Sequence, residues 1–497
     1  MAGMRAVTDA VVVGSGPNGL AAAVTLARAG LEVTVFEAEE TVGGGARTLE
    51  LGLAPGVEHD ICSAVHPLAL ASPFFAEFDL AARGVDLRVP DVAYAQPMAD
   101  GPAGIAYRSL GRTAAELGPD GAAWFGLFGP LVENAPMLTE LALGDRRSLP
   151  AGLLTPTGLG AAVAAASRLF EQGTRAWSAR FQGEVAPALF TGVAAHSITT
   201  LPSLAGAGTA IMLATLAHAS GWPIPVGGSG AIVAALRADL EAHGGRIRTG
   251  HPIRAWRELP RARAYLFDTT PATLLEIWGE RMAPGVRAAL GRFRYGDAAA
   301  KVDYVLSGPV PWADPRVGQA STVHVGGTRE EMAHAEDLVA DGVHAATPLV
   351  LFSDPTVADP GRDVAGLRPG WAYTHVPTGS TVDVTGIVTA QIERFAPGFT
   401  DVVVSSRCVP AAQMAEHNRN YLGGDIAAGA VSTWGMVARP RPTTDPFAAG
   451  IPGVYLCSAS VPPGPGVHGM GGHHAARRAL AQRFDLPAPS LAPDPAP

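Results

Sequence analysis

The sequence predicts an α/β protein built of two interleaved domains. A buried-strand pattern, a glycine turn and a helix open the chain at residues 10–30, and a second strand, loop and helix close it at residues 453–484. Between residues 51 and 222, apolar residues recur at helical spacing with few strands. We therefore expect one domain with a parallel sheet, built from both ends of the chain, and a second domain of the α+β type inserted into it.

The first of these units carries the residues of a dinucleotide-binding βαβ motif. Gly14, Gly16 and Gly19 have the required spacing between the first strand and the first helix, and Glu37 ends the next strand. The glycines permit a tight turn, a close approach of backbone N–H groups to a pyrophosphate, and close packing of helix on strand. Glu37 can accept hydrogen bonds from two ribose hydroxyls. A glycine turn without a ligand is the alternative, but strand, helix and acid together make a strong motif.

A glycine-rich segment follows this motif directly. Residues 43–48 read Gly-Gly-Gly-Ala-Arg-Thr, and successive glycines let the chain run close to a bulky, flat ligand. Gly44 and Gly45 are therefore candidate binding residues, and Arg47 can reach a phosphate or the edge of such a ring system. A flexible loop is the alternative, which the position directly after Glu37 disfavours.

The unit at the other end of the chain repeats the order of strand, loop and helix. Residues 453–460 form the expected strand, residues 461–472 are rich in glycine and proline, and residues 473–484 form the helix. The N-terminus of that helix would bring the positive end of its dipole to an electron-accepting ring. The candidate binding residues of this unit are Ser460, Gly466, Val467 and Met470.

The sequence contains no convincing second dinucleotide fingerprint. Residues 227–230 resemble one, but they follow no buried strand and no acid ends the next strand, so we expect only the start of a helix there. Residues 264–271 predict a short buried strand that returns to the parallel sheet. A dedicated nicotinamide-dinucleotide domain would need a second fingerprint and is therefore not expected.

The composition disfavours several classes of protein. Of the 497 residues, 47% are hydrophobic and 16% charged, which suits a large core with an apolar cavity. The net charge of -9, without a long basic cluster, argues against nucleic acid as a partner. Three isolated cysteines form no disulfide framework or redox dithiol, and the histidines lack the spacing of metal ligands, so no metal is expected.

We expect a cytoplasmic, soluble protein, because residues 1–9 lack the apolar core of a signal peptide. The longest apolar stretch, residues 204–222, is rich in alanine and glycine and contains His218. It predicts a buried or cavity-lining helix. The alternative is a segment that rests in a membrane surface and makes a peripheral membrane contact. The sequence does not predict the oligomeric state.

These segments resemble the phytoene-desaturase-like flavoproteins, within the wider group that includes the amine oxidases. Further stretches sharpen the match and resemble the branch typified by pyridine nucleotide-disulphide oxidoreductase domain-containing protein 2. These stretches are residues 59–68, 301–304, 373–377, 393–399 and 423–425. The resemblance extends from about residue 8 to about residue 482, although the chain lacks the disulphide motif that the name of this branch suggests.

The resemblance implies a Rossmann-type FAD-binding domain interleaved with an α+β substrate domain. Residues 1–95, 223–295 and 426–497 would form the FAD-binding domain, and residues 96–222 and 296–425 the substrate-binding domain. It also implies non-covalently bound FAD, held by the binding residues named above, and removal of a hydride from an extended, hydrophobic small molecule.

We therefore expect an FAD-dependent dehydrogenase or desaturase, which forms a C–C double bond in a lipid, polyene or isoprenoid-like metabolite. Since a nicotinamide domain is not expected, oxygen or a quinone would reoxidise the flavin. Three alternatives stay open: a flavin-dependent saturase or isomerase with an external electron donor, a non-catalytic flavin-binding protein, and an amine or amino-acid oxidase. An amine oxidase would need an aromatic cage, and the chain has only 8 tyrosines.

Lys301 is a candidate catalytic residue, since it is the only lysine in the chain. Where arginine otherwise supplies the basic side chains, a retained lysine suggests a role that arginine cannot fill. It starts an alternating strand that could point it inward, and it resembles the lysine that holds a water at flavin N5 in amine-oxidase relatives. A surface lysine left by chance is the alternative.

His468 is the second candidate catalytic residue, because it lies in the loop expected against the flavin. Carotene desaturases generally lack a histidine there, which disfavours carotene as the substrate. The resemblance brings other histidines near the cavity, each more often structural than a general base: His59, His66, His196 and His375. Asp425, after two glycines, would contact a polar substrate group or serve as a turn residue.

Overall fold

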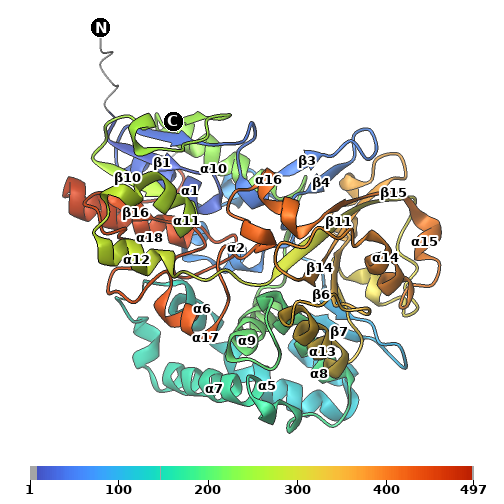
Figure 1. The fold of residues 1–497 in the computed structure, drawn as a ribbon. Coiled ribbons are helices and arrows are strands. Elements are labelled where there is room, and N and C mark those ends of the chain that lie inside the picture. The colour runs from blue at the N-terminus through green and yellow to red at the C-terminus, as the bar shows by residue number, and fades with distance from the viewer. Residues whose placement is uncertain (1–7, 146, 495–497) are drawn as a thin grey trace.

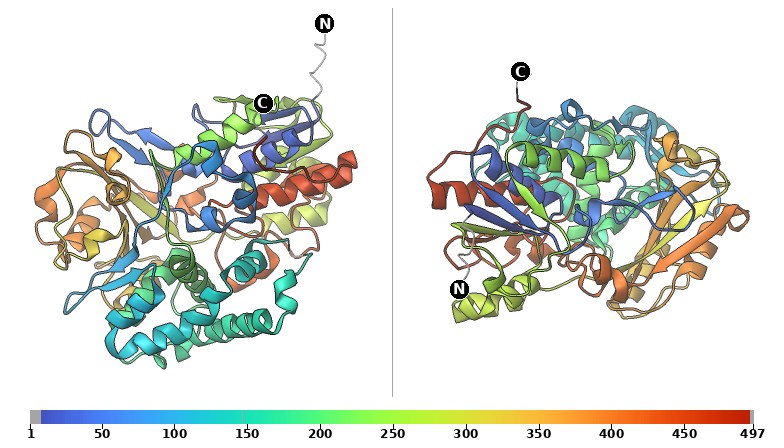
Figure 2. Two further views of the ribbon diagram at one scale, coloured as in Figure 1. Left: turned by 180° about the vertical axis from the view of Figure 1, so that it is seen from behind. Right: turned by 90° about the horizontal axis from the view of Figure 1, so that it is seen from above.

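The computed structural model describes residues 8–145 and 147–494. The chain forms a five-stranded parallel sheet with its helices, a seven-stranded sheet, and a layer of helices (Figure 1). In Figure 1 the parallel sheet lies at the upper left, the seven-stranded sheet at the right and the helical layer at the bottom. The two views in Figure 2 agree that the sheets occupy opposite ends of the molecule and that chain segments cross between them.

The parallel sheet is built from both ends of the chain. Its strand order is β16-β10-β1-β2-β9, and every neighbouring pair is parallel. The strands are β1 (Ala10–Val13), β2 (Val33–Phe36), β9 (Arg246–Arg248), β10 (Ala264–Phe267) and β16 (Val454–Leu456). All residues of β1 are buried, as in a parallel sheet that is covered on both faces. The predicted α/β fold is confirmed, and so is the return of residues 264–271 to this sheet.

Two glycine contacts explain how closely the helices pack. α1 (Pro17–Arg28) follows β1, and a Cβ atom on Gly19 would lie 2.3 Å from the carbonyl oxygen of Gly14. α18 (Met470–Ala479) packs on α1, and a Cβ atom on Gly472 would lie 1.8 Å from the carbonyl oxygen of Asn18. A side chain at either position would therefore force the backbone segments apart.

The seven-stranded sheet has the order β15-β11-β14-β13-β12-β6-β7 and is antiparallel except between β12 and β6. All nine residues of β11 are buried. All strands of the parallel sheet fall within the ranges expected for the FAD-binding domain, residues 1–95, 223–295 and 426–497. β6, which begins at Val92 within the first of these ranges, belongs instead to the seven-stranded sheet. The strands are β6 (Val92–Gln96), β7 (Gly104–Tyr107), β11 (Ala298–Leu306), β12 (Thr322–Val325), β13 (Val350–Ser353), β14 (Arg368–Val376) and β15 (Val403–Val409).

The helical layer comes mainly from residues 110–219. α9 (Leu204–Ala219), the long apolar stretch, packs against α5 (Gly121–Glu133), α7 (Pro156–Gln172) and α8 (Val185–Ala194). Most of α9 is buried and part of it lines a cavity, which confirms the prediction for this stretch. Within residues 8–145 and 147–494, no helix is both long and apolar enough to cross a membrane.

The remaining elements connect these layers. α10 (Gly230–Ala242) confirms the predicted helix start at residues 227–230. A two-residue strand, β8 (Ile224–Pro225), precedes it, contrary to expectation, but pairs with β5 (Leu87–Arg88) outside the parallel sheet. The other helices are α2 (Pro67–Ala71), α3 (Pro73–Phe78), α4 (Leu110–Glu116), α6 (Ala135–Leu143), α11 (Pro271–Trp278), α12 (Pro284–Gly291), α13 (Arg329–Ala340), α14 (Thr385–Glu393), α15 (Phe399–Val402), α16 (Met414–His417) and α17 (Thr433–Ala438). β3 (Thr48–Glu50) and β4 (Glu58–Asp60) form a ribbon.

Candidate functional site

A cavity of about 550 Å³ extends from the carboxyl ends of the parallel strands to the face of the seven-stranded sheet. Ligands bind at this edge of open parallel sheets, because the loops that follow the strands meet there. The parallel-sheet region contributes residues such as Gly14, Glu37 and Gly466, and the seven-stranded sheet contributes Leu351 and Trp371. The volume lies within the range of about 300–1,000 Å³ that is common for small-molecule sites.

The glycine turn after β1 forms one end of the cavity. Four of the glycines predicted to bind a cofactor line it: Gly14, Gly16, Gly44 and Gly45. A Cβ atom on Gly44 would lie 3.0 Å from the Cα atom of Gly16, so the two glycine-rich segments face each other at close range. Gly19 lies behind the turn. The arrangement leaves backbone, rather than side chains, exposed to the cavity.

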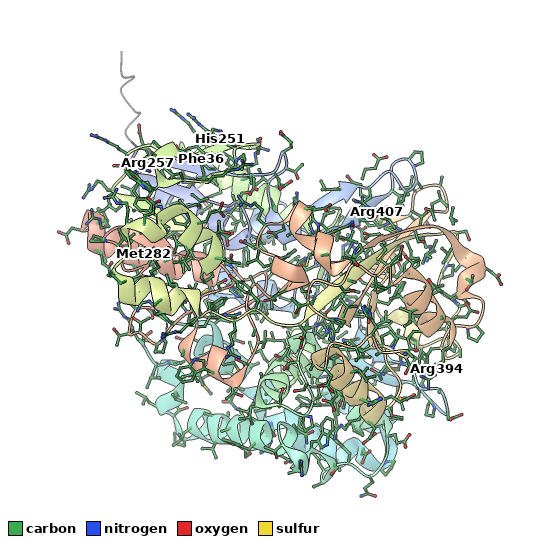
Figure 3. The ribbon with its side chains drawn as sticks, in the orientation of Figure 1. Phe36, His251, Arg257, Met282, Arg394 and Arg407 are labelled. Atoms are coloured by element: carbon green, nitrogen blue, oxygen red, sulfur yellow. The ribbon has the colours of Figure 1, made fainter. Side chains whose placement is uncertain are left out.

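Glu37 lines the same end of the cavity and is held by the backbone around it. Its carboxylate accepts hydrogen bonds from the N–H groups of Ser15, at 2.8 Å, and Glu39, at 2.9 Å. Phe36 and His251 lie beside it and also line the cavity, with ring centroids 5.2 Å apart (Figure 3). Sequence reasoning missed His251, because no motif surrounds it.

Asp268, directly after β10, places a carboxyl group inside the glycine turn. Its Oδ2 atom accepts the N–H group of Gly19 at 2.9 Å and would lie 2.5 Å from a Cβ atom on Gly16. Burial raises the pKa of Asp268 to about 7; the hydrogen bond from Gly19 opposes this rise and the charge of Glu37 adds to it. Sequence reasoning missed this residue, although an acid directly after a strand of the parallel sheet could have indicated it.

Arg47 joins the glycine-rich segment to the neighbouring wall of the cavity that residues 417–421 form. Its guanidinium donates to the carbonyl oxygens of Gly44, at 2.8 Å, and His417, at 2.6 Å, and to the hydroxyl of Thr41, at 3.0 Å. Arg47 is buried and is not among the described residues that line the cavity. Residues 417–421 do line it. Arg47 therefore fixes the position of this wall through the backbone of residue 417.

The C-terminal loop contributes two of its four predicted binding residues to the cavity wall, namely Gly466 and Val467. Ser460 lies behind that wall, where its hydroxyl donates to the carbonyl oxygen of Ala428 at 2.6 Å. Met470 is buried at the first position of α18. Ser460 and Met470 thus support the loop rather than line the described cavity.

His468 has both ring nitrogens engaged by the backbone of its own loop. Nδ1 accepts the N–H group of Met470 at 3.0 Å, and Nε2 donates to the carbonyl oxygen of Gly464 at 3.1 Å. Burial lowers the pKa of His468 to about 4, so the ring is neutral at neutral pH. In this arrangement the side chain shapes the loop, and it lies outside the set of described residues that line the cavity.

Lys301 is buried beside the cavity. Its ammonium group forms an ion pair with Asp303, two residues further along the same face of β11. The two strands β11 and β14 pair so that Lys301 lies opposite Tyr373 and Asp303 opposite Trp371. Trp371 and Tyr373 line the cavity, and Lys301 Nζ lies 5.8 Å from the centre of the Trp371 ring. The ion pair therefore lies next to an aromatic wall, and sequence reasoning missed Asp303 as the partner.

The end of the cavity at the seven-stranded sheet is apolar and aromatic. Its lining includes Met212, Leu213, Trp222, Leu351, Trp371, Tyr373 and Tyr421. The acids among the lining residues, Glu37, Glu39 and Asp268, belong instead to the end with the glycine turn. Two of the 8 tyrosines thus line this cavity, so the small number of tyrosines does not argue against an aromatic site.

The other polar residues singled out in the sequence divide between the cavity and the fold. His66 and His196 line the cavity, whereas His59 and His375 are buried elsewhere. The carboxylate of Asp425 accepts three backbone N–H groups, those of Gly296, Ala427 and Gly429, which is the geometry of a turn residue. Among residues 8–145 and 147–494, no cluster of histidine, cysteine and acidic side chains could hold a metal ion.

Comparisons with known proteins agree with this geometry. Residues 12–78 match the family model of the NAD(P)-binding Rossmann-like domain. The chain is 26% identical to pyridine nucleotide-disulfide oxidoreductase domain-containing protein 2 of Rattus norvegicus, over 94% of this chain and 92% of that protein. A segment of 46 residues, 9% of each chain, is 56% identical to hydroxyneurosporene desaturase of Rhodobacter capsulatus. An engineered putrescine oxidase is similar in structure, with a TM-score of 0.60 at 14% identity, over 96% of this chain and 99% of that one.

The fold is that of the amine oxidases. At this level of identity the structural likeness establishes the fold alone, with its Rossmann-like sheet and its mixed second sheet. The similarity to the rat protein covers nearly the whole chain, which confirms the resemblance inferred from the motifs. The matched family model spans β1 to α3 and thus contains the glycine turn and Glu37.

Proposed function

We propose that the protein is an FAD-dependent oxidoreductase that removes a hydride from a hydrophobic substrate and forms a C–C double bond, with oxygen or a quinone as the final electron acceptor. The observation that carries this proposal is the continuity of the cavity. Residues of the dinucleotide turn and apolar residues of the seven-stranded sheet line the same space. A dinucleotide cofactor and an apolar substrate would therefore meet inside one cavity.

The residues of the cavity fit FAD. Gly14, Gly16 and Gly44 present backbone rather than side chains to this end of the cavity, where the N-terminus of α1 would attract the negative charge of a pyrophosphate. Glu37 would accept hydrogen bonds from a ribose, Phe36 and His251 would flank an adenine, and Gly466 and Val467 would contact the ring system. When bound, FAD supplies a two-electron acceptor for a hydride from a C–H bond.

The protein's own side chains would position the substrate and exclude water. Trp371 and Tyr373 stack on each other with their ring planes 12° apart and form a flat wall. Leu351 and Met212 add apolar surface, and burial of a substrate against such surface stabilises it by about 25 cal/mol per Å². Lys301, next to this wall, would stabilise negative charge that develops nearby or hold a water there, and the ion pair with Asp303 keeps its ammonium group in place.

Oxidation of an amine is the second candidate. Aromatic side chains at the substrate end of the cavity favour it, because ring faces attract ammonium groups. The acids among the lining residues belong to the other end of the cavity, so an ammonium group at the aromatic end would have no lining carboxylate as counter-ion. This distribution of charge favours a hydrophobic hydride donor over an amine as the substrate.

The visible spectrum of the purified protein tests the proposed function. We expect a flavin spectrum and release of FAD on denaturation, and we expect the flavin to stay oxidised when NADPH or NADH is added without oxygen. Hydrophobic C–H donors should bleach it. A protein that neither contains nor binds FAD would exclude the proposal. Bleaching by a nicotinamide dinucleotide would favour a saturase or isomerase, and bleaching by amines would favour the second candidate.

The role of Lys301 has a separate test. Lys301→Met protein should reoxidise its flavin more slowly than the wild type while it retains FAD, because the ammonium group beside the cavity is lost. Since methionine leaves Asp303 without its partner, Lys301→Met/Asp303→Asn is the matched variant with a repaired charge balance. Reoxidation at the wild-type rate in both FAD-loaded variants would exclude a role of Lys301 in the reaction with oxygen.

A further inference from the structure

A row of polar side chains crosses the face of the seven-stranded sheet that closes the cavity. Thr322 on β12 pairs with Ser353 on β13, and Ser353 pairs with Trp371 on β14. Residues directly opposite each other on neighbouring strands share one face of a sheet. Thr322 and Trp371 line the cavity, and Ser353 lies between them on the same face of the sheet, so these three residues, here called the polar row, border the cavity together.

Each member of the polar row has a hydrogen-bonding atom without a partner. Thr322 Oγ1, Ser353 Oγ and Trp371 Nε1 are buried and bond to none of the described residues. The three residues are 2%, 0% and 4% exposed. Buried polar atoms in folded proteins are nearly always paired. Three unpaired atoms in one row at a cavity wall therefore point to a polar group that the cavity receives.

The ionisable side chains on the cavity side of the polar row carry no net charge. His324 lies two residues from Thr322, and its Nε2 atom is 2.8 Å from Nε2 of His196, which lines the cavity. Burial lowers the pKa of His196 to about 3 and the pKa of His324 well below its ordinary value, so at neutral pH both rings are neutral. On the other side of the row, the charges of Lys301 and Asp303 compensate each other. The site thus offers hydrogen bonds but no unpaired charge.

We propose that the polar row binds a neutral oxygen of the substrate, a hydroxyl or carbonyl group on an otherwise apolar molecule. The Trp371 N–H group can only donate, and the hydroxyls of Thr322 and Ser353 can donate or accept, so an acceptor oxygen is a suitable partner for each of these groups. A carboxylate or an ammonium group would bring an uncompensated charge into a buried site, which is unfavourable. The inference rests on the proposed function and specifies its substrate class: an oxygenated hydrophobic compound rather than a pure hydrocarbon or an amine.

Calorimetric binding of octan-2-one and octylamine to the purified full-length protein tests this inference. Thr322→Val replaces the Oγ1 hydroxyl with a methyl group of similar size, and Ser353→Ala removes only the Oγ atom, so each variant loses one polar atom of the row and nearly keeps the shape of the side chain. Thr215→Val is the matched control, because Thr215 is equally buried and its hydroxyl is also unpaired, but it lies on α9 outside the described cavity lining. Equal FAD content and equal melting temperatures would establish that the variants are folded.

We expect octan-2-one to bind more tightly than octylamine, and each variant of the row to weaken octan-2-one binding roughly three- to tenfold, the value of one neutral hydrogen bond. Thr215→Val should bind like the wild type. Unchanged octan-2-one affinity in both row variants, as ordered water in the row would produce, overturns the inference, and so does tighter binding of octylamine. If the protein binds no FAD but the row variants still bind octan-2-one more weakly than the wild type, the polar row is supported and the proposed function is excluded. Failure of this inference and failure of the proposed function therefore give different results.

Discussion

Replacement of Asp268 by asparagine should change how FAD affinity depends on pH. The carboxyl group of Asp268 lies in the glycine turn, where it accepts the N–H group of Gly19 and where burial raises its pKa to about 7. A pyrophosphate would add negative charge to this turn, so the neutral form of Asp268 favours binding and the ionised form opposes it. Asparagine keeps the shape and an acceptor for Gly19, but it cannot ionise.

The magnitude follows from the protonated fraction of Asp268. If only the neutral form permits binding, the dissociation constant for FAD is inversely proportional to the neutral fraction of Asp268. For a pKa of about 7, the neutral fraction falls from about nine-tenths at pH 6 to about one-tenth at pH 8. The dissociation constant should therefore rise roughly tenfold over this range, which corresponds to about 1.4 kcal/mol.

The same group should make the FAD-free protein less stable as the pH rises. Its pKa is raised from 3.8 to about 7, so between these values the folded state binds more protons than the unfolded state. The free energy of unfolding then falls as the pH rises through this window. The loss of stability that Asp268 causes is complete once the pH is above its pKa in the folded state. Asp268→Asn should remove this part of the pH dependence.

Titration of FAD-free protein with FAD measures the effect, with flavin fluorescence as the signal and the ionic strength held constant. At pH 6, 7 and 8 we expect the dissociation constant of the wild type to rise roughly tenfold and that of Asp268→Asn to stay within about twofold. Equal pH dependence in the two proteins would refute the reasoning, because another group would then control binding.

Three further substitutions have defined outcomes. Gly472→Ala should destabilise the protein by roughly 3 kcal/mol in urea unfolding, because its Cβ atom would lie 1.8 Å from the Asn18 carbonyl oxygen; a stable variant would contradict the close packing of α1 and α18. Lys301→Met should cost about 3–5 kcal/mol in the same assay, since Asp303 keeps an uncompensated buried charge, and Lys301→Met/Asp303→Asn should recover much of this loss. Arg47→Lys should lower the FAD content of the purified protein, because the compact ammonium group of lysine cannot reach the three separate acceptors that the planar guanidinium spans. Normal FAD content would argue against the role of Arg47 in holding this wall.

The parallel sheet could be predicted because its signals are local. β1 is an uninterrupted apolar run that ends in a glycine turn, and a helix follows at once. The requirement for glycine at position 19 likewise comes from a contact within a few residues, with the carbonyl oxygen of Gly14. Residues 264–271 could be assigned to the sheet for the same reason, since a short buried strand is apparent from its own composition.

The partners of the site residues could not be predicted, because strand pairing and loop packing bring them together. Lys301 was a candidate from its residue type alone, but its ion pair with Asp303 and its place beside Trp371 depend on the register of β11 with β14. His468 was a candidate from its loop, and only the folded loop engages both of its ring nitrogens.

The sequence by itself determined the dinucleotide turn, the parallel sheet and the apolar character of the inserted domain, because turn geometry and burial patterns arise from interactions within a few tens of residues. Only the tertiary structure decided which polar groups share the cavity. Asp268 meets Gly19 across 249 positions of the chain, and Thr322 joins Ser353 and Trp371 through two strand pairings. Such contacts leave no local pattern in the sequence, because each depends on how elements that are distant in the sequence pack together.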